Sequence, residues 1–272
     1  TLAAANLAGW HPYELAAFNQ TLGGAAAGAR AFQVGWGEGY EQAAAWLNRQ
    51  PDLSGVTVAA ARTETLQPYL RSGAQAYAPS GDYLPPNTGY LVAYIRDTQS
   101  GEPWPPFDRF YGREPPVHVV RIHGVEYAWI YQVPPQPQRP LAATFGDALQ
   151  LRGFDLAEAA TPGTTLDIRL YWGVARAPQS PYAIFIHLAG ADGRRYAQSD
   201  PLLSTDGWGA NRYYTTPLAL VLPPDLPAGA YRLIIGLYDP ASGQRLALSA
   251  PQQQVIANDG PGALELALLV VR

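Results

Sequence analysis

The segment GWGEGYE, residues 35–41, gathers three glycines, two glutamates and a tryptophan. A glycine-rich loop that leads into a helix can hold a phosphate group on its backbone N–H groups. The spacing here is GxGxG rather than GxGxxG, and Glu38 places a negative charge inside the loop. Because no Lys-Ser/Thr pair follows, the segment favours a glycine-rich helix entry over a nucleotide site.

Glu38 and Glu41 are three residues apart at the expected helix start, so their carboxylates could share one face as an acid/base pair. Acidic residues at this position also complement the helix dipole, which is the favoured interpretation. No GxSxG element or other nucleophile motif accompanies them. The sequence therefore assigns no catalytic residue, and whether the chain is an enzyme stays open.

The four histidines do not have the spacing of metal ligands. His118 and His123 are five residues apart on an expected strand and so point to opposite faces, while His11 and His187 have no neighbour at ligand spacing. The absence of cysteine excludes thiolate sites. We expect no metal and no cofactor.

Exposed tryptophan and tyrosine rings can stack on the faces of sugars, and the second half of the chain is rich in them. Core packing is the commoner fate of such rings and is favoured here, for Trp172 among others. As candidate ligand-binding residues the sequence offers Trp36, Glu38, Glu41, Trp208, Tyr213 and Tyr214.

Composition excludes a nucleic-acid partner. All 18 basic residues are arginines, scattered along the 272 residues without a basic cluster, and the formal net charge is -4. The longest apolar run, residues 264–271, is far shorter than the roughly 20 residues that span a bilayer. Since the sequence contains no methionine, we expect a fragment of a longer protein.

Apolar periodicity and turn residues predict two regions of different class. Residues 1–133 predict an α/β (or α+β) domain, with a helix, several strands and a hairpin that turns at Gly124. The proline-rich stretch 134–140 predicts a linker. Residues 141–272 contain short apolar runs separated by Pro, Gly, Asp and Asn, which predict an all-β, immunoglobulin-like or jelly-roll-like sandwich. The helix is expected at 39–49, and strands of the first domain at 56–60, from residue 74 and at 90–97.

Two stretches, HPYELAAFNQTLGG (11–24) and GWGEGYEQAAAWLN (35–48), resemble the region that follows the last membrane helix of bacterial GT-C glycosyltransferases. These are protein mannosyltransferase-like enzymes that use a polyprenyl-phosphate sugar. YLVAYIRDTQ and PVHVVRIHGVEYAWIYQ are similar to the rest of the same extracytoplasmic tail, so the resemblance covers about residues 1–133.

Residues 199–246 look like a β-sandwich module appended to such transferases. The segment GANRYYTTP departs from that pattern, where a Gly-Glu pair followed by an Asp is expected. The resemblance places the catalytic carboxylate in an extracytoplasmic loop near the amino end of the membrane region, outside this chain. No catalytic residue is therefore carried over to it.

The resemblance implies that the intact protein transfers a sugar from a lipid-phosphate donor to an acceptor on the extracytoplasmic face of the cell membrane. This chain would be a non-catalytic domain pair that binds or positions the acceptor. Its partners would be the transmembrane portion of the same polypeptide and a glycan or polyprenyl-phosphate sugar. The alternative is a stand-alone carbohydrate-binding or adhesion β-sandwich module.

Overall fold

A computed structural model describes residues 7–71, 73–99, 101, 103–250 and 260–272. The chain divides into two compact units, Thr1–Pro134 and Pro135–Arg272, each with its own core. The division lies one residue beyond the end of the expected first domain. The two units are described separately.

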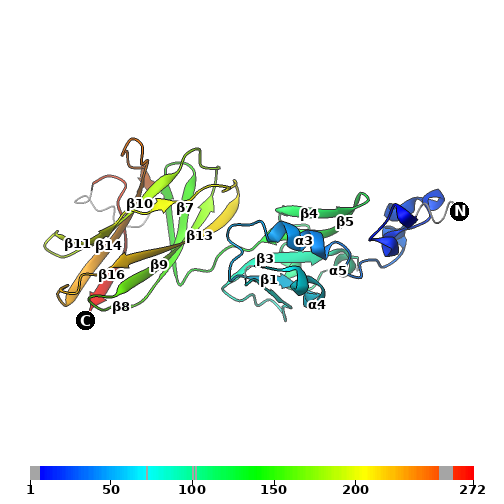
Figure 1. The fold of residues 1–272 in the computed structure, drawn as a ribbon, viewed down its shortest axis with the longest axis horizontal. Helices are drawn as coiled ribbons and strands as arrows, with labels where there is room; N and C mark the ends of the chain where they lie inside the picture. The colour runs from blue at the N-terminus through cyan, green and yellow to red at the C-terminus, as the bar shows by residue number, and fades with distance from the viewer. Residues whose placement is uncertain (1–6, 72, 100, 102, 251–259) are drawn as a thin grey trace. The chain divides into compact units, whose positions relative to one another are not determined.

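Within the described part of the first unit, five strands form one mixed sheet in the order β2-β1-β3-β5-β4 (Figure 1). β1 pairs in parallel with both β2 and β3, whereas β5 pairs antiparallel with β3 and β4. The strands are β1 (Thr57–Ala60), β2 (Gln75–Tyr77), β3 (Thr88–Tyr94), β4 (His118–Ile122) and β5 (Val125–Gln132).

The two faces of this sheet are covered by different kinds of structure. Tyr40 and Leu47 of helix α3 and Leu66 of helix α4 pack with one face of the strands, on residues such as Val58 and Val92. The opposite face lies under loops and the short 3-10 turn η4, with Leu84 and Phe107 among the covering residues. The helices are α2 (Gly24–Ala31), α3 (Tyr40–Leu47), α4 (Thr63–Leu66) and α5 (Ile95–Thr98), with short 3-10 turns η1 (Glu14–Ala16), η2 (Gln20–Leu22), η3 (Gln67–Tyr69) and η4 (Phe107–Arg109).

The order in which the parallel strands are added to the sheet reverses at β1. From β1 the chain moves to β2 on one side, and then crosses to β3 on the other side of β1. This arrangement makes the β1/β3 boundary a topological switch point. In open sheets with parallel strands, ligands bind in the crevice beyond the carboxyl ends of the strands at such a point.

Two local expectations in this unit have clear outcomes. The hairpin turning at Gly124 is confirmed: His123 and Gly124 both have positive φ, as a two-residue hairpin turn of the primed type requires. The strand expected over 90–97 ends earlier, at Tyr94, and residues 95–98 form α5. The strand ends there because Asp97 turns toward Arg62 and the Thr98 hydroxyl donates to the Ile95 carbonyl.

Over its described residues, the second unit consists of two sheets packed face to face (Figure 1). One has the order β11-β10-β14-β16-β8, with β12 also paired to β10, and the other the order β13-β9-β7-β6-β15. The strands are β6 (Arg139–Phe145), β7 (Leu149–Leu156), β8 (Ala159–Ala160), β9 (Thr165–Val174), β10 (Tyr182–Ala189), β11 (Arg195–Ser199), β12 (Leu202–Leu203), β13 (Arg212–Val221), β14 (Gly229–Tyr238), β15 (Leu248–Ser249) and β16 (Leu264–Val271).

Alternation along the strands produces the core between the two sheets. On β9, Leu166, Ile168 and Leu170 are buried, whereas the residues between them face outward. Trp172 continues the series, is fully buried, and donates its indole N–H to the Thr216 hydroxyl at 3.1 Å. The prediction of a β-sandwich is confirmed; its immunoglobulin-like or jelly-roll-like assignment stays a prediction.

The expected linker at 134–140 is too long by two residues. Strand β6 begins at Arg139, and Pro140 pairs with Gly153 of β7. Proline has no N–H, so it cannot donate a hydrogen bond to a neighbouring strand. On the side of β6 away from β7, strand β15 pairs only with residues 144 and 145, so no strand lies beside Pro140 there. Pro140 therefore lies at a free edge, where a strand tolerates it.

Among the described residues, no helix is long and apolar enough to cross a membrane.

Replacing Trp172 by Ala tests the sandwich core. We expect a loss of about 3–5 kcal/mol in the free energy of unfolding, because the change leaves a large cavity and removes the partner of Thr216. Urea unfolding followed by circular dichroism measures this loss. Val221→Ala, at a position 72% exposed, is the control and should stay within about 0.5 kcal/mol of the parent.

Candidate functional site

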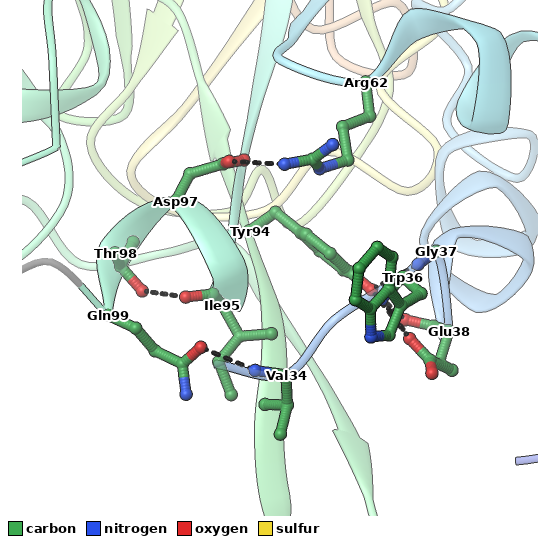
Figure 2. A network of polar contacts seen from close by, with 10 residues as sticks. All are labelled: Val34, Trp36, Gly37, Glu38, Arg62, Tyr94, Ile95, Asp97, Thr98 and Gln99. Carbon is green, nitrogen blue, oxygen red and sulfur yellow. Dashed lines mark hydrogen bonds and ion pairs between the residues drawn. The ribbon is translucent and has the colours of Figure 1, made fainter. Parts of the chain in front are cut away.

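Polar side chains gather at the switch point, just beyond the carboxyl ends of β1 and β3. Arg62 follows β1, and Tyr94 closes β3 and is followed by Arg96 and Asp97 on α5. The loop 35–39, which leads into α3, lies against the same strand ends (Figure 2). We call this set of residues the switch-point site.

The loop approaches the strand ends so closely that only glycine fits. Gly35 and Gly37 both have positive φ. A Cβ atom on Gly35 would lie 2.8 Å from side-chain atoms of Tyr94 and Ile95, and one on Gly37 would lie 2.6 Å from Thr65. Both the backbone conformation and the space therefore require glycine at these two positions.

The backbone N–H groups of the loop are already used. Trp36 N–H donates to the Glu38 carboxylate at 2.6 Å, Gly37 N–H to the Tyr94 hydroxyl at 3.0 Å, and Gly39 N–H to the Glu41 carboxylate at 3.1 Å. A phosphate would have to displace these internal acceptors. The geometry therefore agrees with a glycine-rich helix entry rather than a phosphate loop.

The same bonds define what Glu38 and Glu41 do. Each carboxylate closes the loop on itself, and Glu41 also accepts a hydrogen bond from the Tyr13 hydroxyl. Gln42 donates to that hydroxyl at 2.6 Å, so residues from the N-terminal segment and α3 are linked. Both glutamates thus stabilise the loop and the start of α3.

An ion pair crosses the switch point. Arg62 Nη2 and Asp97 Oδ1 are 3.2 Å apart, and the Asp97 side chain is only 10% exposed. Within the described part of the chain, Arg62 Nε and Arg96 Nη1 are buried atoms that have no hydrogen-bond partner. Buried donors are normally satisfied, so these two N–H groups are exceptions in a site that is otherwise well bonded.

Trp36 projects from the loop beside this charged group (Figure 2). Its side chain is 67% exposed, and the Arg96 guanidinium lies 4.0 Å from its ring centroid. A cation at this distance from an indole face is held by the ring quadrupole. Trp36 is therefore fixed on one side by Arg96 and open to solvent over most of its surface.

Burial shifts the acidities of this site. Burial raises the pKa of Asp97, and the Arg62 guanidinium opposes that shift without cancelling it. Burial likewise raises the pKa of the Tyr94 hydroxyl, which reaches both the backbone carbonyl and the carboxylate of Glu38. Burial, with the Glu38 charge second, raises the pKa of Tyr127 to about 12. The tyrosines therefore stay protonated and act as hydrogen-bond donors at neutral pH.

The aromatic candidates of the second unit are placed differently. Trp208 and Tyr214 are 8% and 5% exposed and stack on each other with ring centroids 4.5 Å apart. The Tyr214 hydroxyl accepts the Gly209 N–H at 2.8 Å. These two rings belong to the core and offer no face to a sugar. Tyr213, their neighbour on β13, points to the outer face and is half-buried.

The histidines pack against other rings. His118 stacks on Trp46 at 5.1 Å between ring centroids, and His123 lies against Trp10 at 3.8 Å. In the described ranges, no group of three or more His, Asp or Glu side chains could hold a metal ion.

Sequence reasoning found Trp36, Glu38 and Glu41 of this region but missed Arg62, Arg96 and Asp97. The sequence signal for these three residues was weak. It consists of charged residues directly after two apolar runs: ARTE after residues 56–60, and IRD after residues 90–94. Polar residues directly after parallel strands mark the ligand edge only when the strands are known to be adjacent and parallel.

No family model matches the sequence, and no curated protein matches it. Among solved structures, the C-terminal domain of Wzt aligns over 49% of this chain and 82% of its own, with 14% identity and a TM-score of 0.33. The CARDB domain of PF1109 from Pyrococcus furiosus aligns over 50% of this chain and 95% of its own, with 7% identity and a TM-score of 0.26. β-Glucuronidase 2 of Bacteroides uniformis aligns over 45% of this chain and 15% of its own, with 17% identity and a TM-score of 0.28.

Gly35→Ala tests the close approach of the loop. We expect a loss of roughly 2–3 kcal/mol in the free energy of unfolding, because the new Cβ meets Tyr94 and Ile95 and the backbone stays at positive φ. Gly55→Ala is the matched control, since Gly55 also has positive φ but would contact nothing within 4 Å. Equal losses for the two variants in urea unfolding would show that packing of the loop adds nothing.

Asp97→Asn tests the buried ion pair through pH. Because the pKa of Asp97 is raised in the folded state above its ordinary value of 3.8, its contribution to stability is fully present below that value and is lost as pH rises through the folded-state pKa. The stability of the parent relative to Asp97→Asn should therefore decrease from pH 3.5 to pH 7. Denaturant unfolding of both proteins across this range measures the difference, and a constant difference would contradict the shift.

Proposed function

We propose that this chain is the extracytoplasmic, non-catalytic portion of a membrane glycosyltransferase that takes its sugar from a polyprenyl-phosphate donor. In this proposal residues 1–133 are an α/β domain that binds the acceptor glycan at the switch-point site. The sandwich follows as an appended module of immunoglobulin-like or jelly-roll-like type. The remaining partner is the transmembrane portion of the same polypeptide.

Support for the parent class comes from the sequence. The stretches at 11–24 and 35–48, and the later strands of the first unit, resemble the tail of GT-C transferases of the protein mannosyltransferase type. The catalytic carboxylate of that family lies outside the matching region. This agrees with a first unit whose two candidate acids, Glu38 and Glu41, accept backbone N–H groups of their own loop.

The observation that carries the binding role is the exposure of Trp36. Trp36 is 67% exposed, and the loop that carries it is held by two glycines in close contact with the strand ends. A rigid aromatic ring beside a few polar groups is the usual platform for the apolar face of a sugar. Its position beyond parallel strand ends is also where such sheets bind ligands.

The charges around Trp36 favour a neutral sugar over a phosphate. Two guanidiniums, on Arg62 and Arg96, are matched by two carboxylates, on Glu38 and Asp97. The loop N–H groups are occupied, so no anion cradle is offered. The exposed ring of Trp36 suits the apolar face of a neutral sugar. The proposed ligand is therefore the acceptor glycan rather than the donor's phosphate.

The alternative of a stand-alone carbohydrate-binding sandwich has lost most of its original support. It was founded on the aromatic residues of the second half, and Trp208 and Tyr214 are stacked in the core. Of the three candidate rings named for the second unit, Tyr213 is the one on the outer face.

Trp36→Ala tests the acceptor site. In a glycan-array screen of the purified chain followed by calorimetry, we expect selective binding of a neutral oligosaccharide that weakens about tenfold or more in the variant, because a stacked ring is lost. Folding should be unaffected, since the side chain is exposed.

Trp104→Ala is the matched control. Trp104 is the other exposed tryptophan of the described first unit, 42% exposed, and it lies against Phe107 under the opposite face of the sheet. It should bind the glycan like the parent. Unchanged binding by Trp36→Ala, or no glycan binding by any of the three proteins, would contradict an acceptor-binding role.

A further inference from the structure

The outer face of the five-stranded sheet of the sandwich contains a hollow of about 330 Å3, within the size range of small-molecule sites. It lies over β6, β7 and the short strand β15. It is lined by four polar residues, Thr144, Gln150, Arg152 and Ser249, and by four apolar ones, Leu141, Ala142, Ala143 and Leu151. The hollow is independent of the switch-point site, which belongs to the other unit.

A β-bulge produces this hollow. Pro140 pairs with Gly153 and Ala143 with Leu151, so two residues of β6 stand opposite one residue of β7. The residue of β7 at this irregularity is Arg152. Bulges bend a strand and redirect side chains, and they are frequent beside binding sites.

A row of polar side chains crosses the sheet at the hollow. The strand registers place Ser249 opposite Thr144, Thr144 opposite Gln150, Gln150 opposite Gly173, and Gly173 opposite Tyr213. All of these residues except Gly173 have polar side chains, and these four polar residues are exposed or half-buried on the outer face. Directly opposite residues on one face lie close enough to act on one ligand.

Gly173, in the middle of this row, has no side chain and so leaves space on the outer face of the sheet. Its φ is not in the left-handed region, so the backbone does not require glycine there. A Cβ atom at this position would instead lie 3.1 Å from Arg152 Cδ and 3.7 Å from Gln150 Oε1. The glycine therefore provides the space in which these two side chains lie.

Arg152 joins the hollow to the aromatic end of the row. Its guanidinium lies 5.4 Å from the ring centroid of Tyr213, at cation–π distance. This contact limits the freedom of a long side chain, so less entropy is lost when its N–H groups bind a ligand.

The hollow has a positive charge that its own lining does not balance. Arg152 is the charged residue among those that line it. The outward acid further along β7, Asp155, already accepts the Tyr171 hydroxyl at 2.5 Å and the Gln138 N–H at 2.8 Å. A planar guanidinium binds carboxylate and phosphate oxygens in a bidentate manner, and Ser, Thr and Gln side chains suit sugar hydroxyls.

We propose that this hollow binds an anionic saccharide, with Arg152 holding its carboxylate or phosphate and Thr144, Gln150 and Ser249 contacting its hydroxyl groups. The site differs in chemistry from the switch-point site, where acidic and basic groups are matched. It does not depend on the proposed acceptor role of Trp36.

Calorimetric titration of the purified chain tests the proposal with three probes: tetragalacturonate for the carboxylate, glucose 6-phosphate for the phosphate, and maltotetraose as the neutral counterpart. We expect binding of at least one anionic probe that is tighter than that of maltotetraose and that weakens as salt rises. Arg152→Gln should weaken it at least tenfold.

Two further variants test the place of binding: one fills the hollow and the other is a control outside it. Gly173→Val should also abolish binding while leaving unfolding nearly unchanged, because only flexible side chains must give way and valine suits a strand. Arg169→Gln, at an outward position on β9 away from the hollow, is the matched control and should bind like the parent. Equal binding of maltotetraose, unchanged binding in Arg152→Gln, or no binding of either anionic probe would each overturn the proposal.

Discussion

The first unit depends on the contact between a backbone loop and the ends of two parallel strands. Gly35 and Gly37 lie against Tyr94, Ile95 and Thr65 at distances that no side chain could share. This contact fixes where α3 begins, directs the loop N–H groups toward Tyr94 and the two glutamates, and leaves Trp36 pointing to solvent. The exposure of Trp36 is thus a consequence of the tight packing beneath the loop.

The same contact explains why a glycine-rich loop need not be a phosphate loop. In a phosphate loop the N–H groups stay free for the ligand until it arrives. Here side chains from the loop itself and from the end of β3 accept them. The glycines serve close packing and positive φ, and the glutamates serve the helix start. Any ligand of this region therefore meets side chains, chiefly Trp36, Arg62 and Arg96.

The two units offer surfaces of contrasting chemistry. At the switch point, half-buried carboxylates accompany the arginines, so the region has little net charge and one exposed ring. On the outer face of the sandwich, one arginine stands among neutral hydroxyl and amide groups over a bulge.

The sequence by itself determined the elements whose signals are local. Short apolar runs separated by turn residues identified the strands of residues 141–272 as a class, and helical spacing identified the helix that begins near residue 40. The density of proline after residue 133 identified the boundary region to within a few residues. The glycine-rich loop with Trp36 and the glutamates was also visible. Only the tertiary structure decided which rings are exposed, because Trp36 and Trp208 look alike in sequence and differ only in what packs against them. It also decided that Arg62 meets Asp97 and that Gln150, Gly173 and Tyr213 form one row, since strand order and register join residues far apart in the chain.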